Sequence, residues 1–315
     1  CLVGSEMCIR DRWLGYHYRQ SFNKYSDPYS LDNLSSSLEL AYVNLKARHN
    51  LNFTIGKQFV NFGGYEYYVN SIRVREFSEF NNLLTAYQAG ISGNWQVNPD
   101  HELCFQIVNN RNGNDEDIYP TGLPEGTAKA KIPFMYTVNW NSYYLDKSLQ
   151  LRYATAVGQQ TRKRYSYYFT CGNTYEKGPL LTYLDVMYTR QGIDQHGVVS
   201  RLPGTPHTAM NTEYLSIIGD VDYRVHPQWN VYVKGAYETA RVYKGNGDFR
   251  KGMYRRSWNA QSSVEFFPFK QLDLFVFVLY TYRGVILEKA ATRMGAIEPD
   301  THRISLGLVY SIPVF

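Results

Sequence analysis

The sequence predicts an all-β fold, a transmembrane antiparallel β-barrel with about 14 visible strands. Three observations support it: long segments in which apolar and polar residues alternate, connections that are alternately short and long, and abundant tyrosine. The chain holds 29 Tyr among 315 residues. Tyrosine is favoured where its ring can meet lipid while its hydroxyl meets water, so this content suits a chain that faces a membrane.

Hydropathy gives no sign of a membrane-spanning helix. The most apolar run, at 274–280, is far shorter than the roughly 18 residues that such a helix needs. The mean hydropathy of −0.42 would by itself indicate a soluble protein. Barrel strands alternate between lipid and lumen and therefore average out as polar, so low hydropathy is compatible with the predicted barrel.

The alternation is clear in residues 271–283. Leu274, Val276 and Val278 share one face of a strand there, while Asp273 and Phe275 share the other. A helix would scatter these side chains, whereas a strand separates them into two faces. Most of the predicted strands run to about ten residues or more, longer than the roughly five or six of an average globular strand. They are 13–22, 34–47, 50–59, 86–97, 101–110, 132–145, 148–158, 163–172, 179–190, 211–224, 228–240, 253–267, 271–283 and 300–315.

Short and long connections alternate between these strands. Short ones lie at 47–50, 98–100, 146–147, 226–227 and 268–270, and long ones at 23–33, 60–85, 111–131, 191–210, 241–252 and 284–299. Outer-membrane barrels have tight periplasmic turns and long external loops, and a soluble sandwich has no reason to keep that order. Two connections fit less well, because 159–162 is a short external link and 173–178 a longer periplasmic one.

Composition argues against several other functions. The net charge of +5 comes from 33 basic and 28 acidic residues that are spread along the chain, and no nucleic-acid-binding motif is present. The four Cys show no metal-ligand spacing, so we expect neither a metal nor another cofactor. None of the seven His belongs to a recognisable catalytic motif, so we expect no enzyme.

The first twelve residues, CLVGSEMCIRDR, look foreign to the rest. They resemble translated sequencing-adapter read-through, and we interpret 1–12 as a non-native leader outside the fold prediction. The alternative reading, a lipidated Cys1 of a mature lipoprotein, explains less. The barrel is then expected over 13–315, with the native sequence beginning near Trp13 and its true start missing.

The last strand ends the chain as a barrel would. Its apolar row runs from Ile304 to Ile312, and its end falls on the short-turn side. Phe315 is similar to the terminal aromatic residue that the barrel-assembly machinery of Gram-negative bacteria recognises. Phe315 and Pro313 are out of phase with the apolar row, so a bulge or a frayed end is expected between them.

A family resemblance supports this interpretation. The strand AYVN (41–44), a tight turn and TIGKQFVNFGGYE (54–66) stand before a strand-poor stretch. This arrangement resembles the phosphate-selective porin O and P family in its Bacteroidota form. The resemblance implies a sixteen-stranded barrel in the outer membrane, a homotrimer, and an inward-folded third loop, with one strand pair missing from this sequence.

On that resemblance, the strand-poor stretch 60–85 is a candidate pore constriction. Its charged residues would narrow the pore and set a field across it; the alternative is an ordinary external loop whose charges face water. Arg73 and Arg75 are the candidate anion contacts, because a guanidinium can grip phosphate or carboxylate with two hydrogen bonds. The other candidates at the constriction are Glu66, Glu76 and Glu79.

The rest of the lumen wall is expected to be mixed in sign. Arg152, Lys234 and Asp273 alternate into the lumen. Further carboxylates with the same parity are Asp185, Asp220, Asp222, Glu238 and Glu265. The evenly basic lining of a dedicated phosphate channel is not visible, so the family's name does not identify the solute.

The predicted function is passive diffusion of small hydrophilic solutes across an outer membrane, with a weak preference for anions. The expected partners are outer-membrane lipid, the solutes themselves and the assembly machinery, with no nucleic acid. Two alternatives stay open. The chain could export an acidic polysaccharide, since alginate-export barrels also carry a G-[KR]-Q strand before a Gly-rich link. It could also be a plugged barrel with a structural or surface-binding role.

Overall fold

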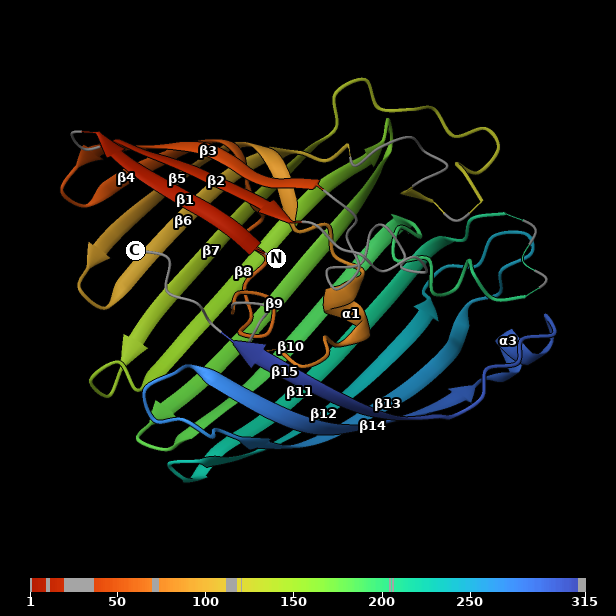
Figure 1. The fold of residues 1–315 in the computed structure, drawn as a ribbon. Coiled ribbons are helices and arrows are strands. Elements are labelled where there is room, and N and C mark those ends of the chain that lie inside the picture. Colours follow the sequence, from red (N-terminus) through yellow and green to blue (C-terminus); the bar gives the residue numbers. More distant parts are fainter. Residues whose placement is uncertain are drawn as a thin grey trace.

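A single curved sheet forms the molecule (Figure 1). The computed structural model describes residues 2–9, 12–19, 37–69, 74–111, 118–119, 121–203, 205 and 207–310. Fifteen strands pair in sequence order, each antiparallel to the next. They are β1 (Leu2–Ile9), β2 (Arg12–Arg19), β3 (Ser37–Arg48), β4 (Leu51–Phe59), β5 (Tyr87–Asn98), β6 (His101–Asn109), β7 (Phe134–Tyr144), β8 (Leu149–Thr161), β9 (Arg164–Lys177), β10 (Leu180–Ile193), β11 (Met210–His226), β12 (Trp229–Val242), β13 (Gly252–Phe266), β14 (Leu274–Leu287) and β15 (Thr301–Tyr310).

The predicted all-β barrel architecture is confirmed, and each predicted strand has its counterpart in β2–β15. The short external link is also present, because only 162–163 separate β8 from β9. The prediction of a longer link at 173–178 is wrong. Residues up to Lys177 continue strand β9 and pair with β10, so 178–179 form an ordinary tight turn. Phe315 and the expected irregularity at Pro313 lie outside the described residues.

The sequence shows no strand pattern in residues 2–9, but in the structure they form β1 and pair with β2. With fifteen antiparallel strands, β1 and β15 run in the same direction. No pairing joins these two edge strands in the part of the chain that the structure describes. The interpretation of 1–12 as a non-native leader is not decided by this pairing.

The two faces of the sheet follow the predicted alternation. On β14, Val276 and Val278 are 39% and 49% exposed, whereas Phe275 and Leu279 are 7% and 2% exposed. The outward face therefore carries the apolar row, as the sequence predicts. The inward face is mostly polar but includes apolar side chains on β14.

The inner segment, residues 60–86, connects β4 to β5. Its described parts, 60–69 and 74–86, lie inside the curve of the sheet (Figure 1). It contains the one-turn helix α1 (Glu79–Asn82), whose Ser78 cap accepts a hydrogen bond from the Asn81 N–H. Its Phe62, Tyr67 and Phe80 belong to the buried apolar cluster of the molecule. The core therefore sits between the inner segment and the strands.

A second one-turn helix, α3 (Lys289–Thr292), lies in the connection between β14 and β15. Within the described residues, no helix has both the length and the apolar character needed to cross a bilayer.

Candidate pore constriction

The inner segment approaches the wall closely at two glycines. Gly63 and Gly64 have φ values of +77° and +81°. Residues other than glycine rarely adopt this backbone region, because their Cβ clashes there. Gly172 on β9 faces Gly64, and a Cβ at Gly172 would lie 2.5 Å from the Gly64 Cα. Backbone therefore meets backbone at this point, and the GGYE motif has a steric reason.

Asp185 on β10 holds the residues that follow this turn. Its carboxylate accepts hydrogen bonds from the backbone N–H of Tyr65 at 2.8 and 2.9 Å and from that of Glu66 at 2.9 Å. Both donors would otherwise be buried without a partner, which is costly. Asp185 therefore fixes the start of the inner segment against the wall.

Glu66 is the centre of the strongest anchoring network. Its carboxylate accepts from the Ser78 N–H at 3.0 Å, from the Ser78 hydroxyl at 2.5 Å and from Asn81 Nδ2. It also pairs with Lys234 Nζ from β12, and both side chains of this ion pair are fully enclosed. Lys234 Nζ further donates to the Glu76 carbonyl at 2.6 Å. The two ends of the inner segment are thus tied to each other and to one strand.

Glu76 and Glu79 reach the last strands. Glu76 accepts from the Thr281 hydroxyl at 2.9 Å and pairs with Arg303. Glu79 pairs with Arg255 and, at 3.2 Å, with Arg283. The inner segment starts at β4 and ends at β5. Its ion pairs with β13–β15 therefore show that it extends across the lumen to the last strands.

Glu238 on β12 completes the seat of α1. Its carboxylate accepts from the Phe80 N–H at 2.9 Å, from the Glu79 N–H at 3.3 Å and from the Ser216 hydroxyl at 3.0 Å. It therefore satisfies backbone donors at the start of the helix that have no intrahelical partner.

Arg75 is paired rather than free. Its Nε donates to Glu265 Oε1 at 2.6 Å, and the ion pair is almost fully enclosed. The guanidinium also lies 4.9 Å from the ring centroid of Phe275. Arg73, the other predicted anion contact, lies outside the described residues.

The three predicted wall residues take different positions. Lys234 lies at the centre of the network around Glu66. Arg152 stacks over the ring of Tyr68 at 4.4 Å. Asp273 stands exposed just before β14, at the short-turn end of the sheet. The structure therefore gathers Glu66, Glu76, Glu79 and Lys234 into one assembly and leaves Asp273 at its rim.

The long connection between β10 and β11 (194–209) contacts the inner segment from the side of the long connections, and its described residue His196 packs against α1. The His196 ring meets Phe80 edge-on at 5.0 Å and lies 5.0 Å from the ring of Tyr214. Burial, with a smaller contribution from Arg201, lowers the pKa of His196 to about 3. Asp194 holds this connection in place by accepting from Ser200 Oγ at 2.7 Å and from the Tyr214 hydroxyl at 2.5 Å.

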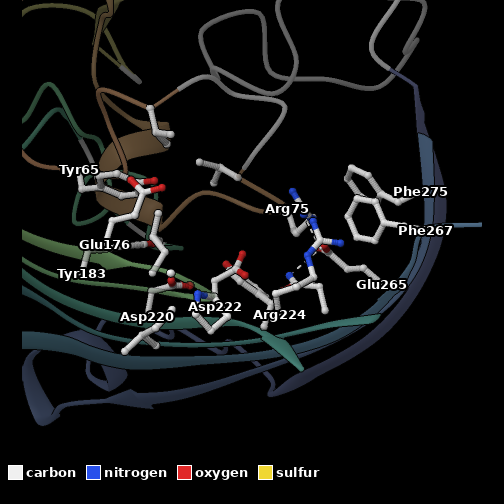
Figure 2. A pocket seen from close by; sticks show the side chains of 18 of the residues that line it. Tyr65, Arg75, Glu176, Tyr183, Asp220, Asp222, Arg224, Glu265, Phe267 and Phe275 are labelled. Carbon is white, nitrogen blue, oxygen red and sulfur yellow. Dashed lines mark hydrogen bonds and ion pairs between the residues drawn. The ribbon is translucent and has the colours of Figure 1, made fainter. Parts of the chain in front are cut away.

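A cavity of about 550 Å³ lies between the inner segment and the short-turn ends of β9–β14. Figure 2 shows Asp220 and Asp222 on one side of this pocket and Arg75 with Glu265 on the other. The cavity extends the lumen on the side of the turns.

Sequence reasoning missed the anchoring roles of Asp185, Glu238 and Glu265. Their alternation placed them in the lumen, but no local signal says which inward carboxylate meets a backbone N–H and which meets a cation. Asp194 was missed altogether, because it lies in a long connection.

Comparison with known proteins supports the same architecture. The model of the family described as phosphate-selective porin O and P matches residues 10–312. No curated protein matches the chain. Among solved structures, the chain is similar to the outer membrane channel DcaP of Acinetobacter baumannii, with a TM-score of 0.64 and 13% identity over 98% of this chain and 83% of that one.

Two other porins show the same fold. Salmonella typhi OmpF, solved in a complex with daunomycin, gives a TM-score of 0.62 and 14% identity over 98% of this chain and 88% of that one. The anion-selective porin from Comamonas acidovorans gives a TM-score of 0.58 and 10% identity over 95% of this chain and 84% of that one.

Proposed function

The chain belongs to the phosphate-selective porin O and P family, and on this premise we propose that its inner segment forms the constriction of the pore. The protein is an outer-membrane porin for small solutes. Solutes diffuse through a water-filled lumen and pass the inner segment at its narrowest level. Short turns then face the periplasm and long connections face outward.

One observation supports this proposal above the others. The inner segment is bound on its far side by inward side chains of five strands, among them Asp185, Lys234 and Glu265. An ordinary external loop would keep its charges in water. The charged side chains of this segment instead form ion pairs with the wall, and the segment crosses the lumen rather than leaving it (Figure 1).

Internal pairing also bears on selectivity. The described charges of the inner segment are matched by partners on the wall: Glu66 with Lys234, Arg75 with Glu265, and Glu79 with Arg255. Paired charges produce a weaker field than isolated ones. We therefore propose that ion selectivity is weak, that Arg75 acts first as an anchor, and that an anion preference depends on Arg73 together with Arg75.

Recordings of single channels in planar bilayers test this function. We expect a steady conductance that increases several-fold when residues 74–84 are replaced by a short Gly-Ser link. Shortening the external connection at 289–295, which keeps Glu298 paired with Arg255 and Arg283, is the matched control and should leave conductance nearly unchanged. Equal conductance of the two deletion variants would show that the constriction lies elsewhere.

The same recordings separate the alternatives. A plugged structural barrel would give no steady conductance. A polysaccharide exporter would conduct but would be blocked by uronate oligomers at concentrations that leave a general porin open.

We also propose that the porin is a homotrimer of Bacteroidota type, inserted by the barrel-assembly machinery. The mass of the unheated protein in detergent tests the trimer, and a mass of one chain would contradict it. The genomic context of the gene would test the source.

A further inference from the structure

The cavity beneath the inner segment has an acidic wall. Five carboxylates and two guanidinium groups line it. The carboxylates belong to Glu176, Asp220, Asp222, Glu265 and Asp273, and the guanidinium groups to Arg75 and Arg224. The charges of Arg75 and Glu265 cancel, because these two side chains form an ion pair. Arg224 stacks on Phe267, with its Cζ 3.7 Å from the ring centroid, so four carboxylates face a single remaining cation.

Asp220 stands out among these carboxylates. Its side chain is 3% exposed, and neither carboxylate oxygen has a hydrogen-bond partner among the described residues. Lys234 lies opposite Asp220 in the β11–β12 ladder, but its Nζ is engaged by Glu66 and the Glu76 carbonyl. A buried carboxylate without a partner is costly, so this position favours the arrival of a cation.

Asp222 adds a second carboxyl group at the same place. It lies two residues along β11, on the same face of the strand, and lines the same cavity. Two adjacent carboxylates attract a cation more strongly than either alone, and partial enclosure limits screening by salt.

The remaining lining favours an organic cation over a metal ion. Aromatic rings of Tyr65, Tyr183, Tyr232 and Phe275 face the cavity, and such rings attract ammonium groups. In the described part of the chain, no three His, Cys, Asp or Glu side chains are arranged so that they could hold a metal ion. The volume of about 550 Å³ is in the range of pockets that enclose small molecules.

We propose that this periplasmic pocket binds a small organic cation, an ammonium group on an aromatic or apolar body, with the ammonium between Asp220 and Asp222. The inference rests on the proposed function only in that the lumen provides access. It assigns the porin a cationic solute subsite on the periplasmic side of its constriction.

Equilibrium binding to the folded full chain in detergent tests the proposal. The probes are phenethylammonium, uncharged 2-phenylethanol and anionic phenylacetate, titrated calorimetrically with empty micelles as the blank. We expect saturable binding of phenethylammonium alone, which weakens as salt is raised. Asp220→Asn should reduce its affinity at least tenfold and Asp222→Asn severalfold. Asp146→Asn, in the exposed turn between β7 and β8 and outside the cavity, is the matched control and should change it less than twofold.

Equal binding of all three probes, or no saturable binding of phenethylammonium, would overturn the inference. So would an affinity that survives the Asp220→Asn/Asp222→Asn double substitution. If Asp220→Asn does not fold by heat-modifiable gel mobility, the comparison of probes on the unaltered chain still decides. Conductance of the same preparation separates the two claims, because a conducting channel without binding would contradict the subsite and leave the porin function intact.

Discussion

Lys234 of β12 and Glu66 of the inner segment form an ion pair in which both side chains are fully enclosed. Removing two charges from water offsets much of their attraction, so such a pair adds little net stability. Breaking it is a different matter, because one charge is then left buried and alone. The pair therefore serves to position the inner segment.

Replacing one partner of this pair should release the inner segment. We expect Lys234→Met to destabilise its seat by about 3–5 kcal/mol, because Glu66 is left without a counter-charge. Limited proteolysis within 60–86 would measure the release. The double change Lys234→Met/Glu66→Gln removes both charges and should be cleaved more slowly than the single variant. Faster cleavage of the double variant would contradict the role of the charges.

Arg75 and Glu265 should affect ion selectivity in opposite directions. Arg75→Gln leaves a carboxylate uncompensated in the pore, so the reversal potential in a salt gradient should move toward cation selectivity. Glu265→Gln leaves a guanidinium and should move it toward anions. Adding Arg73→Gln to the first variant should increase its shift without lowering conductance. The pairing has no effect on permeation if both single variants keep the original reversal potential.

The outward row of β14 should not tolerate charge. Val276→Arg places a cation against the hydrocarbon core, at a cost of about 2–4 kcal/mol near the midplane. Asp273→Asn, at the rim on the opposite face, should cost little. The temperature at which gel mobility changes on heating measures the stability of each variant. Similar decreases of that temperature in the two variants would invalidate the assignment of faces.

Acid should loosen the contact between the connection 194–209 and α1. His196 is neutral when folded because burial lowers its pKa to about 3, below the unfolded value of about 6.5. The stability gained from the neutral ring is present above about pH 6.5 and is lost as pH falls toward 3. At about 1.4 kcal/mol per pKa unit, the full loss of stability is about 5 kcal/mol.

The pH effect can be isolated with one variant. His196→Phe keeps a ring beside Phe80 and Tyr214 but cannot titrate. The nearby Asp194, Glu238 and Arg201 remain, so the difference between the two proteins reports His196. Acid stability curves that run parallel between pH 7 and 4 would rule out this contribution.

The first residues should be dispensable. A chain beginning at Arg12 lacks β1 but keeps β2–β15, and we expect it to fold with unchanged heat-modifiable mobility and conductance. The control removes 1–19, which also deletes β2 and should impair folding. Impaired folding of the shorter truncation would show that β1 is a native part of the wall.

Much of the fold could be read from the sequence because a barrel strand has a simple period. The predicted 211–224 corresponds to β11, and its inward parity correctly placed Asp220 and Asp222 in the lumen. The extension of β9 to Lys177 was missed, because its last residues are polar on both faces. Pairing with β10, rather than local pattern, determines where that strand ends.

The site was less predictable for a physical reason. The motif around Gly63 and Gly64 marked the start of the inner segment, yet its partners lie on distant strands. Asp185 is 119 residues from Glu66 in the chain, and Glu265 is 190 from Arg75. Period and parity indicate that a side chain points inward, but the curvature of the whole sheet decides what that side chain meets there.

The long reach of these contacts has a consequence for biogenesis. The inner segment is synthesised early, between β4 and β5, but the side chains that seat it come from strands made much later, such as Lys234 on β12. Contacts between residues so distant in the chain form late and slowly. If the inner segment forms the constriction, as we propose, a barrel that is still being assembled has an unnarrowed channel, and the pore reaches its final width only once the C-terminal strands are in place.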